Sequence, residues 1–230
     1  MTQAIALDCG MKVAVRRSTR ARRMLLRVSR SDGSAVVTLP PRTSLQEARH
    51  FVLSRAEWLR KAAAEAPGIK TVLPGVALPV AGEALTITPA AVRLCQIEGS
   101  RLLVPHGRPM GPVLAAWLRE RARAVLVPAA RRHAAALPVG ARPLAAVTLR
   151  DTRSRWGSCT AAGRLMFSWR LAMAPPEVLD YVAAHEVAHL LHLDHSPAFW
   201  DRVALLHPGW QARRDWLRRN GQELLAWSFR

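Results

Sequence analysis

The segment HEVAHLLHLDH, from His185 to His195, constrains this chain more than any other feature, because it holds four of the eight histidines. His185 and His189 are four residues apart, so on a helix they share a face and can converge on one metal ion. Glu186 lies about 100° further round the helix, where its carboxylate can reach a metal-activated water without binding the metal. The segment therefore predicts a metal-binding helix that supplies two ligands and a base.

His195 is the expected third ligand, since it follows His189 by six residues, as in the metzincin pattern HExxHxxGxxH. That pattern has glycine where this chain has His192, and the glycine allows the helix to end and the chain to turn back. A straight helix would carry His195 about 9 Å along its axis from His189. We therefore expect the helix to end between Leu190 and Asp194, with His192 or Asp194 in an unusual backbone conformation. His192 is expected to support the ligands or pack in the loop rather than bind the metal.

An amphipathic helix with solvent-facing histidines is the alternative to a metal site. An HExxH match arises by accident about 0.01 times in a chain of this composition, which favours the metal site. Both interpretations can hold together, since the apolar residues of the motif can pack the helix while its histidines line a cleft.

Short strands are expected in the first half of the chain. Alternating apolar residues predict an antiparallel meander over residues 11–40, and residues 67–108 combine Pro and Gly with short apolar runs that also indicate strands. Between them, apolar residues at helical spacing predict one helix over residues 44–66, with Ser44 and Glu47 forming a capping box.

Helices dominate the second half. A helical pattern begins at Pro112, and Pro128 is expected to kink or divide that helix. The other expected elements are a strand over 145–152, a loop over 154–163, a strand over 163–173, the motif helix, and helices over 197–206 and 209–226. The fold class is therefore α+β, with a strand-rich region over residues 1–108 and a mainly helical domain over residues 109–230, which could also form one continuous unit.

Basic residues exceed acidic ones by 34 to 16, which gives a formal charge of +18. This excess could attract nucleic acid or phosphorylated small molecules, and seven arginines gather between Arg16 and Arg30. Because only three basic residues are lysine, the arginines could instead reflect a coding bias. The three cysteines are far apart, and the sequence contains no evident signal peptide or membrane span, which together indicate a cytoplasmic protein.

The histidine motif continues as HEVAHLLHLDHSPAFW and is preceded by RSRWGSC, FSWRLAMAP and DYVAAHE. Together these stretches resemble the YgjP-like zinc metallopeptidase family, which is related to the SprT-like and Wss-type proteases. The resemblance covers most of the chain, with residues 67–110 matching only loosely. It implies a zincin-like catalytic domain, in which a small antiparallel or mixed sheet accompanies the motif helix and further helices follow. It also implies zinc bound by His185, His189 and His195, with Glu186 as catalytic base.

In zincin folds the edge strand of the sheet borders the cleft and can pair with an extended peptide, and residues 163–173 would be that strand. Arg153 and Arg155 would lie near the same rim, where they could bind acidic substrate groups or carboxylates of the fold. Tyr181 shares a helical face with His185, so it could donate a hydrogen bond to an oxyanion or pack against the sheet.

The sequence therefore predicts a zinc-dependent metalloendopeptidase that hydrolyses peptide or unfolded-protein substrates with Glu186 as general base. Two alternatives remain open. The same metal site could hydrolyse nucleotide phosphoanhydrides, with arginines binding the phosphates. Alternatively, the basic N-terminal region could bind DNA and bring the protease to a nucleoprotein target, as the related SprT-like group suggests by analogy.

Overall fold

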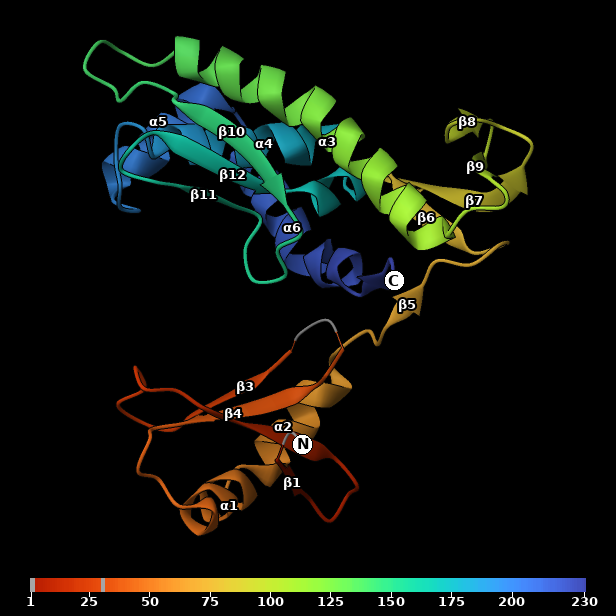
Figure 1. Cartoon of the computed structure of the whole chain (residues 1–230). Coiled ribbons are helices and arrows are strands. Elements are labelled where there is room, and N and C mark those ends of the chain that lie inside the picture. Colours follow the sequence, from red (N-terminus) through yellow and green to blue (C-terminus); the bar gives the residue numbers. More distant parts are fainter. Residues whose placement is uncertain (1–2, 30–31) are drawn as a thin grey trace. The chain divides into compact units, whose positions relative to one another are not determined.

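The computed structural model describes residues 3–29 and 32–230 (Figure 1). The chain divides into two compact units, residues 1–69 and residues 70–230. Each unit combines helices with small sheets, so the predicted α+β class is confirmed. Arg30, the last residue of the predicted basic cluster, lies outside the described residues. Within the described part of the chain, no helix has the length and apolar character needed to span a membrane.

The first unit contains a four-stranded sheet with the strand order β1-β2-β4-β3. Its strands are β1 (Ala4–Ala6), β2 (Lys12–Arg17), β3 (Leu25–Val28) and β4 (Ala35–Leu39). β2 and β4 pair in parallel, with Val13 opposite Ala35, so the prediction of an antiparallel meander is wrong. Alternating apolar residues identify strands, but they do not specify which strands become neighbours.

Two helices complete the first unit, α1 (Leu45–Leu53) and α2 (Ala56–Ala64), where the sequence predicted one. The capping box is confirmed: the Glu47 backbone N–H donates to Ser44 Oγ at 3.1 Å, and the Ser44 N–H donates to the Glu47 carboxylate at 2.7 Å. The break falls at Ser54, whose hydroxyl donates to the Phe51 carbonyl at 2.9 Å. Such a bond competes with helix continuation, which explains why the apolar spacing alone predicted too long a helix.

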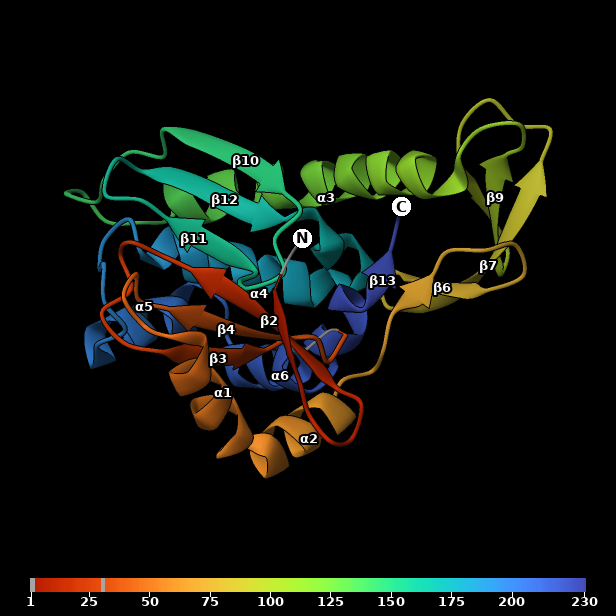
Figure 2. The same cartoon turned by 60° about the horizontal axis from the view of Figure 1, so that its bottom comes forward.

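The second unit contains three small sheets and four α-helices (Figures 1 and 2). Its first sheet has the order β6-β7-β9-β8, from β6 (Ala77–Val80), β7 (Glu83–Ala90), β8 (Gln96–Glu98) and β9 (Arg101–Pro105). A two-stranded sheet pairs β5 (Lys70–Thr71) with β13 (Trp227–Ser228). The third sheet consists of β10 (Ala146–Arg150), β11 (Gly157–Cys159) and β12 (Arg164–Ser168).

The boundary predicted between residues 108 and 109 lies inside this second unit. Leu78 and Leu102, from the first sheet, belong to the same buried apolar cluster as Leu114 and Phe167. Because these side chains lose their contact with water together, the strands before residue 108 form one structural unit with the helices after it.

Four helices and one short 3₁₀ segment follow from Met110 onwards. They are α3 (Met110–Ala135), η1 (Trp169–Met173), α4 (Pro176–Ala188), α5 (Pro197–Leu206) and α6 (Trp210–Leu225). Pro128 lies inside α3 without dividing it. Leu126, Ala129 and Ala130 are buried on either side of the proline, and this packing holds the helix together where the backbone loses a hydrogen bond.

The three-stranded sheet has the order β10-β12-β11, which corrects two predictions. β11 lies within the stretch predicted as a loop, and the strand predicted over residues 163–173 ends at Ser168 and continues as η1. Gly163, with φ of 70°, allows a tight turn in which its N–H donates to the Thr160 carbonyl, so that β11 folds back antiparallel to β12. β12 is therefore central, and β11 is the edge strand that packs beside α4.

α4 lies at the centre of the second unit, where α3, α5 and α6 pack against it (Figures 1 and 2). Nine of its 13 residues are buried, and they lie all round the helix rather than on one stripe. A helix that is buried on all sides belongs to the core. Burial of each large apolar side chain contributes about 1.5–3 kcal/mol, so the position of α4 is strongly fixed.

Candidate metal centre

α4 ends just before the second histidine of the motif. Ala188 is its last helical residue, and the chain then turns, with the His192 N–H donating to the Ala188 carbonyl at 3.0 Å. The helix therefore ends slightly earlier than the predicted interval between Leu190 and Asp194. After the turn, α5 begins at Pro197, as predicted.

The turn does not use the unusual backbone conformation that the sequence predicted. Among the described non-glycine residues, only Ala81 has a positive φ, so His192 and Asp194 both avoid the left-handed region. The Ser196 N–H instead donates to the Asp194 carboxylate at 3.2 Å. This hydrogen bond holds the end of the turn, which explains how the chain reverses without a glycine.

The turn brings His195 back to His185 of α4 and to His189, the residue that follows the helix. Donor nitrogens of His185, His189 and His195 all lie within 4.8 Å of one another, and the Nε2 atoms of His185 and His195 are 3.3 Å apart. Three nitrogens bound tetrahedrally to zinc at ~2.0–2.1 Å would be ~3.3–3.4 Å apart. The three imidazoles could therefore hold one metal ion after small side-chain adjustments.

The surroundings of His185 and His189 favour the neutral form of these two side chains. Burial lowers the pKa of His185 to about 3, and the charges of His189, His195 and Arg214 act in the same direction. Burial also lowers the pKa of His189. A metal binds the neutral imidazole, so these environments suit metal ligands.

His192 contributes its backbone to the cluster. His189 Nδ1 lies 2.8 Å from the His192 carbonyl oxygen, so Nδ1 carries the proton and donates it to that oxygen. This hydrogen bond orients the His189 ring and leaves the Nε2 lone pair available. The supporting role of His192 stays a prediction, and this hydrogen bond is the contact through which it would act.

Glu186 is 6% exposed and lies beside the histidines on α4. Burial raises the pKa of Glu186 to about 8, and the positive charge of Arg155 opposes this shift. β11 passes very close to this carboxyl: a Cβ on Gly157 would lie 2.5 Å from the Glu186 Cγ and Oε1 atoms. Gly157 was not predicted as a site residue, although a glycine between residues that can form a strand is a known signal of close backbone approach.

A hollow of about 280 Å³ opens above these residues. It is lined by Gly157, Ser158 and Cys159 of β11, and by His185, Glu186, His189, Leu193 and His195. One wall is thus an edge strand, and the floor is the motif helix with its turn. Burial and the charge of Glu186 raise the pKa of Cys159 to about 11, against an opposing effect of Arg142, so the thiol stays protonated and unreactive near neutral pH.

The remaining predicted site residues, Tyr181, Arg153 and Arg155, do not line the hollow. Tyr181 is 5% exposed, and its ring packs edge-on against His185 and His207 at centroid distances of 6.0 and 6.2 Å. It is not among the residues that line the hollow, in agreement with the packing alternative. Arg153 and Arg155 are both exposed, and neither lines the hollow, although the charge of Arg155 is close enough to influence the pKa of Glu186.

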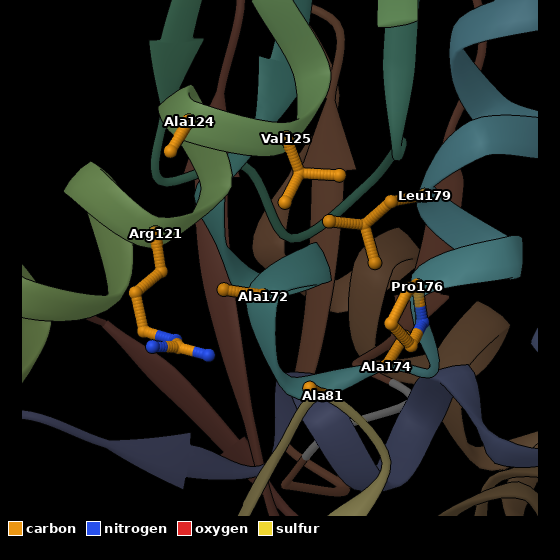
Figure 3. A pocket seen from close by; sticks show the side chains of 8 residues that line it. All are labelled: Ala81, Arg121, Ala124, Val125, Ala172, Ala174, Pro176 and Leu179. Atoms are coloured by element: carbon orange, nitrogen blue, oxygen red, sulfur yellow. The ribbon is translucent and has the colours of Figure 1, made fainter. Parts of the chain in front are cut away.

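A second hollow, of about 190 Å³, lies away from the histidines between α3, η1 and the start of α4 (Figure 3). Its lining residues are Ala81, Arg121, Ala124, Val125, Ala172, Ala174, Pro176 and Leu179. Arg121 is the one charged residue among these eight, and the other walls are apolar. A triphosphate would need several cationic or polar groups, so this hollow does not favour the nucleotide alternative.

A comparison with protein-family models matches the YgjP-like metallopeptidase domain over residues 22–220. Searches of the curated proteins and of the solved structures found no match. The matched region includes α4, the turn that follows it and β11. A metallopeptidase family implies a metal cofactor and peptide substrates, in agreement with three histidines that could hold a metal. The chain therefore belongs to the YgjP-like metallopeptidase family.

Proposed function

We propose that this chain is a zinc-dependent endopeptidase with a zincin-like active site. In this proposal His185, His189 and His195 bind the zinc, and Glu186 is the general base. The observation that carries it is the convergence of the three imidazoles, with two Nε2 atoms 3.3 Å apart, close to the separation of two nitrogens on one zinc ion. The set of three nitrogen donors, with no carboxylate or thiolate among them, also suits zinc.

Zinc would supply a Lewis acid that lowers the pKa of a water and polarises a carbonyl group. Glu186 accepts the proton of the attacking water and then donates it to the leaving amine nitrogen. The carboxyl is suited to both steps because it lines the same hollow as the histidines and is held there against Gly157. The backbone carbonyl of His192 keeps the His189 ring oriented throughout.

The edge strand β11 would position the substrate. Within the described part of the chain, β11 pairs with β12 along one side only, so its other side would be available for main-chain hydrogen bonds with an extended peptide. Gly157, Ser158 and Cys159 line the hollow, which places this strand next to the carboxyl of Glu186. Pairing along the main chain does not require a free peptide end, and we therefore propose internal cleavage.

The test combines metal content with turnover. Purified protein is expected to contain about one zinc per chain, and Glu186→Gln should retain the zinc while losing hydrolysis of an unfolded protein. His195→Ala should lose most of the zinc. Loss of zinc in Glu186→Gln would contradict the proposed division of roles. Glu186-dependent hydrolysis of nucleoside triphosphates, without hydrolysis of the unfolded protein, would replace the peptidase proposal with the phosphoanhydride alternative.

A further inference from the structure

A cationic and aromatic group lies beside His185 and His195 and is not used in the proposed mechanism. It consists of Trp200 on α5, and Trp210 and Arg214 on α6; we call it the Arg214 group. The Trp200 ring stacks on His195 with centroids 5.8 Å apart, and it lies 5.6 Å from the His185 ring. The group is therefore in contact with two of the three proposed zinc ligands.

The two indoles hold the arginine in a defined position. Trp200 and Trp210 stack with centroids 4.4 Å apart and an angle of 18° between their planes. The Arg214 Cζ atom lies 4.9 Å from the Trp200 ring centre and 5.8 Å from that of Trp210. Trp210 and Arg214 are four residues apart on α6, so they share one face of the helix. Cation–π contacts to both rings fix the guanidinium over Trp200, the ring that stacks on His195.

The charge of Arg214 is not compensated by an acidic group. Within the described residues, Arg214 forms no hydrogen bond or ion pair, and the adjacent Asp215 pairs with Arg218 at 3.4 Å. The Arg214 side chain is exposed. Contacts with aromatic rings leave the five N–H donors of a guanidinium available, and those donors form a planar fork that matches a carboxylate.

We propose that the Arg214 group is a subsite that binds a carboxylate of the peptide substrate. This inference rests on the proposed peptidase function, and it adds a preference for acidic peptides. The indoles of Trp200 and Trp210 supply an apolar surface for the adjoining part of the peptide, and Arg214 binds the carboxylate with two N–H donors. The carboxylate can belong to an acidic side chain or to the C-terminus of the peptide.

Binding of labelled peptides to the zinc-loaded Glu186→Gln protein tests this subsite without turnover. One peptide series carries Glu at each position in turn, and a matched series carries Gln instead. A further pair ends in a free carboxylate or in an amide. We expect at least one acidic peptide to bind about tenfold more tightly than its neutral partner, the factor that a charge-assisted hydrogen bond of ~1.4 kcal/mol gives. The pair that shows this preference identifies the source of the carboxylate.

Arg214→Gln, added to the same protein, should remove the preference for the acidic peptide and leave binding of the neutral peptide within about twofold. Arg218→Gln is the matched control, because it removes an arginine one turn further along α6 that already pairs with Asp215. It should leave the preference intact. The subsite is contradicted if the Glu186→Gln protein with Arg214 in place shows no preference for acidic peptides. It is also contradicted if adding Arg214→Gln leaves that preference unchanged.

Turnover by the Glu186-containing protein distinguishes failure of the subsite from failure of the proposed function. Hydrolysis of the acidic and neutral peptides at equal kcat/KM, with zinc bound, would overturn the subsite and leave the peptidase proposal intact. Carboxylate-dependent binding without any hydrolysis would overturn the peptidase proposal and retain the binding site. In an active enzyme, Arg214→Gln should raise KM for the acidic peptide more than it lowers kcat.

Discussion

Replacing Gly157 with alanine should impair the proposed base while leaving the zinc ligands in place. Gly157 does not have a positive φ, so alanine can adopt its backbone conformation without strain. The new Cβ would lie 2.5 Å from Cγ and Oε1 of Glu186 and 2.7 Å from Cδ. Ordinary carbon contacts are ~3.5–4.0 Å, so the Glu186 side chain or the strand must move by about 1 Å.

A displacement of about 1 Å at a reacting group costs about 10²-fold in rate, which corresponds to about 2.7 kcal/mol of transition-state stabilisation. The same crowding is expected to lower the free energy of unfolding by ~1–3 kcal/mol. The measurements are kcat on an unfolded-protein or peptide substrate, zinc content, and urea unfolding. We expect kcat to fall about 100-fold with zinc content unchanged.

Two comparisons separate displacement of Glu186 from general crowding. Gly111→Ala, on α3, is the matched control. Its new Cβ would also meet an atom at 2.5 Å, the carbonyl oxygen of Phe229. It should lower stability without lowering turnover per folded molecule. In the Gly157→Ala background, Glu186→Asp shortens the crowded side chain, so the two substitutions should combine less than additively. An unchanged kcat in Gly157→Ala would refute the proposed displacement of Glu186. Strictly additive losses of kcat for Gly157→Ala and Glu186→Asp would refute it as well.

Three further outcomes follow from the site and its surroundings. His195→Ala should weaken zinc binding by at least ~100-fold in a competition assay with a chelator, because it removes a proposed ligand; an unchanged affinity would remove this residue from the site. Arg170, which is 1% exposed, donates to Asp151 at 2.6 Å and to the Trp227 carbonyl at 2.8 Å, so Arg170→Met should cost about 3 kcal/mol in urea unfolding. The raised pKa of Glu186 predicts a pH effect in zinc-free protein: the contribution of this group to stability is fully present below pH ~4.5 and is lost as the pH rises to about 8. The free energy of unfolding of Glu186→Gln should therefore rise relative to that of the parent protein over that interval, by up to ~1.4 kcal/mol per pH unit. Parallel curves of unfolding free energy against pH for the two proteins would contradict the raised pKa of Glu186.

Local spacing accounts for the parts of the site that the sequence predicted. The four-residue interval between His185 and His189 sets their common face, because an α-helix repeats every ~3.6 residues. Ser196 and Pro197 likewise indicated where α5 begins, since Pro fits the first helical position. Each of these features depends on neighbours within a few residues along the chain.

Sheet order accounts for what the sequence missed. The expected edge strand over residues 163–173 became the centre of its sheet, and β11, expected as a loop, became the edge next to Glu186. Strand alternation is the same for a central and an edge strand when both are short, so the sequence carried little information about this order. The importance of Gly157 follows only from this corrected order.

The sequence by itself determined the α+β class, the family, the helix that carries His185 and Glu186 and leads into His189, and the need for that helix to end before His195. Tertiary structure alone decided that β11 borders the hollow, that Gly157 contacts Glu186, and that Arg214 of α6 lies over Trp200 of α5, the ring that stacks on His195. The physical reason is the range of the interactions involved. Helical periodicity and capping act between residues close in the chain, whereas strand pairing and aromatic stacking join residues whose separation in sequence carries no signal.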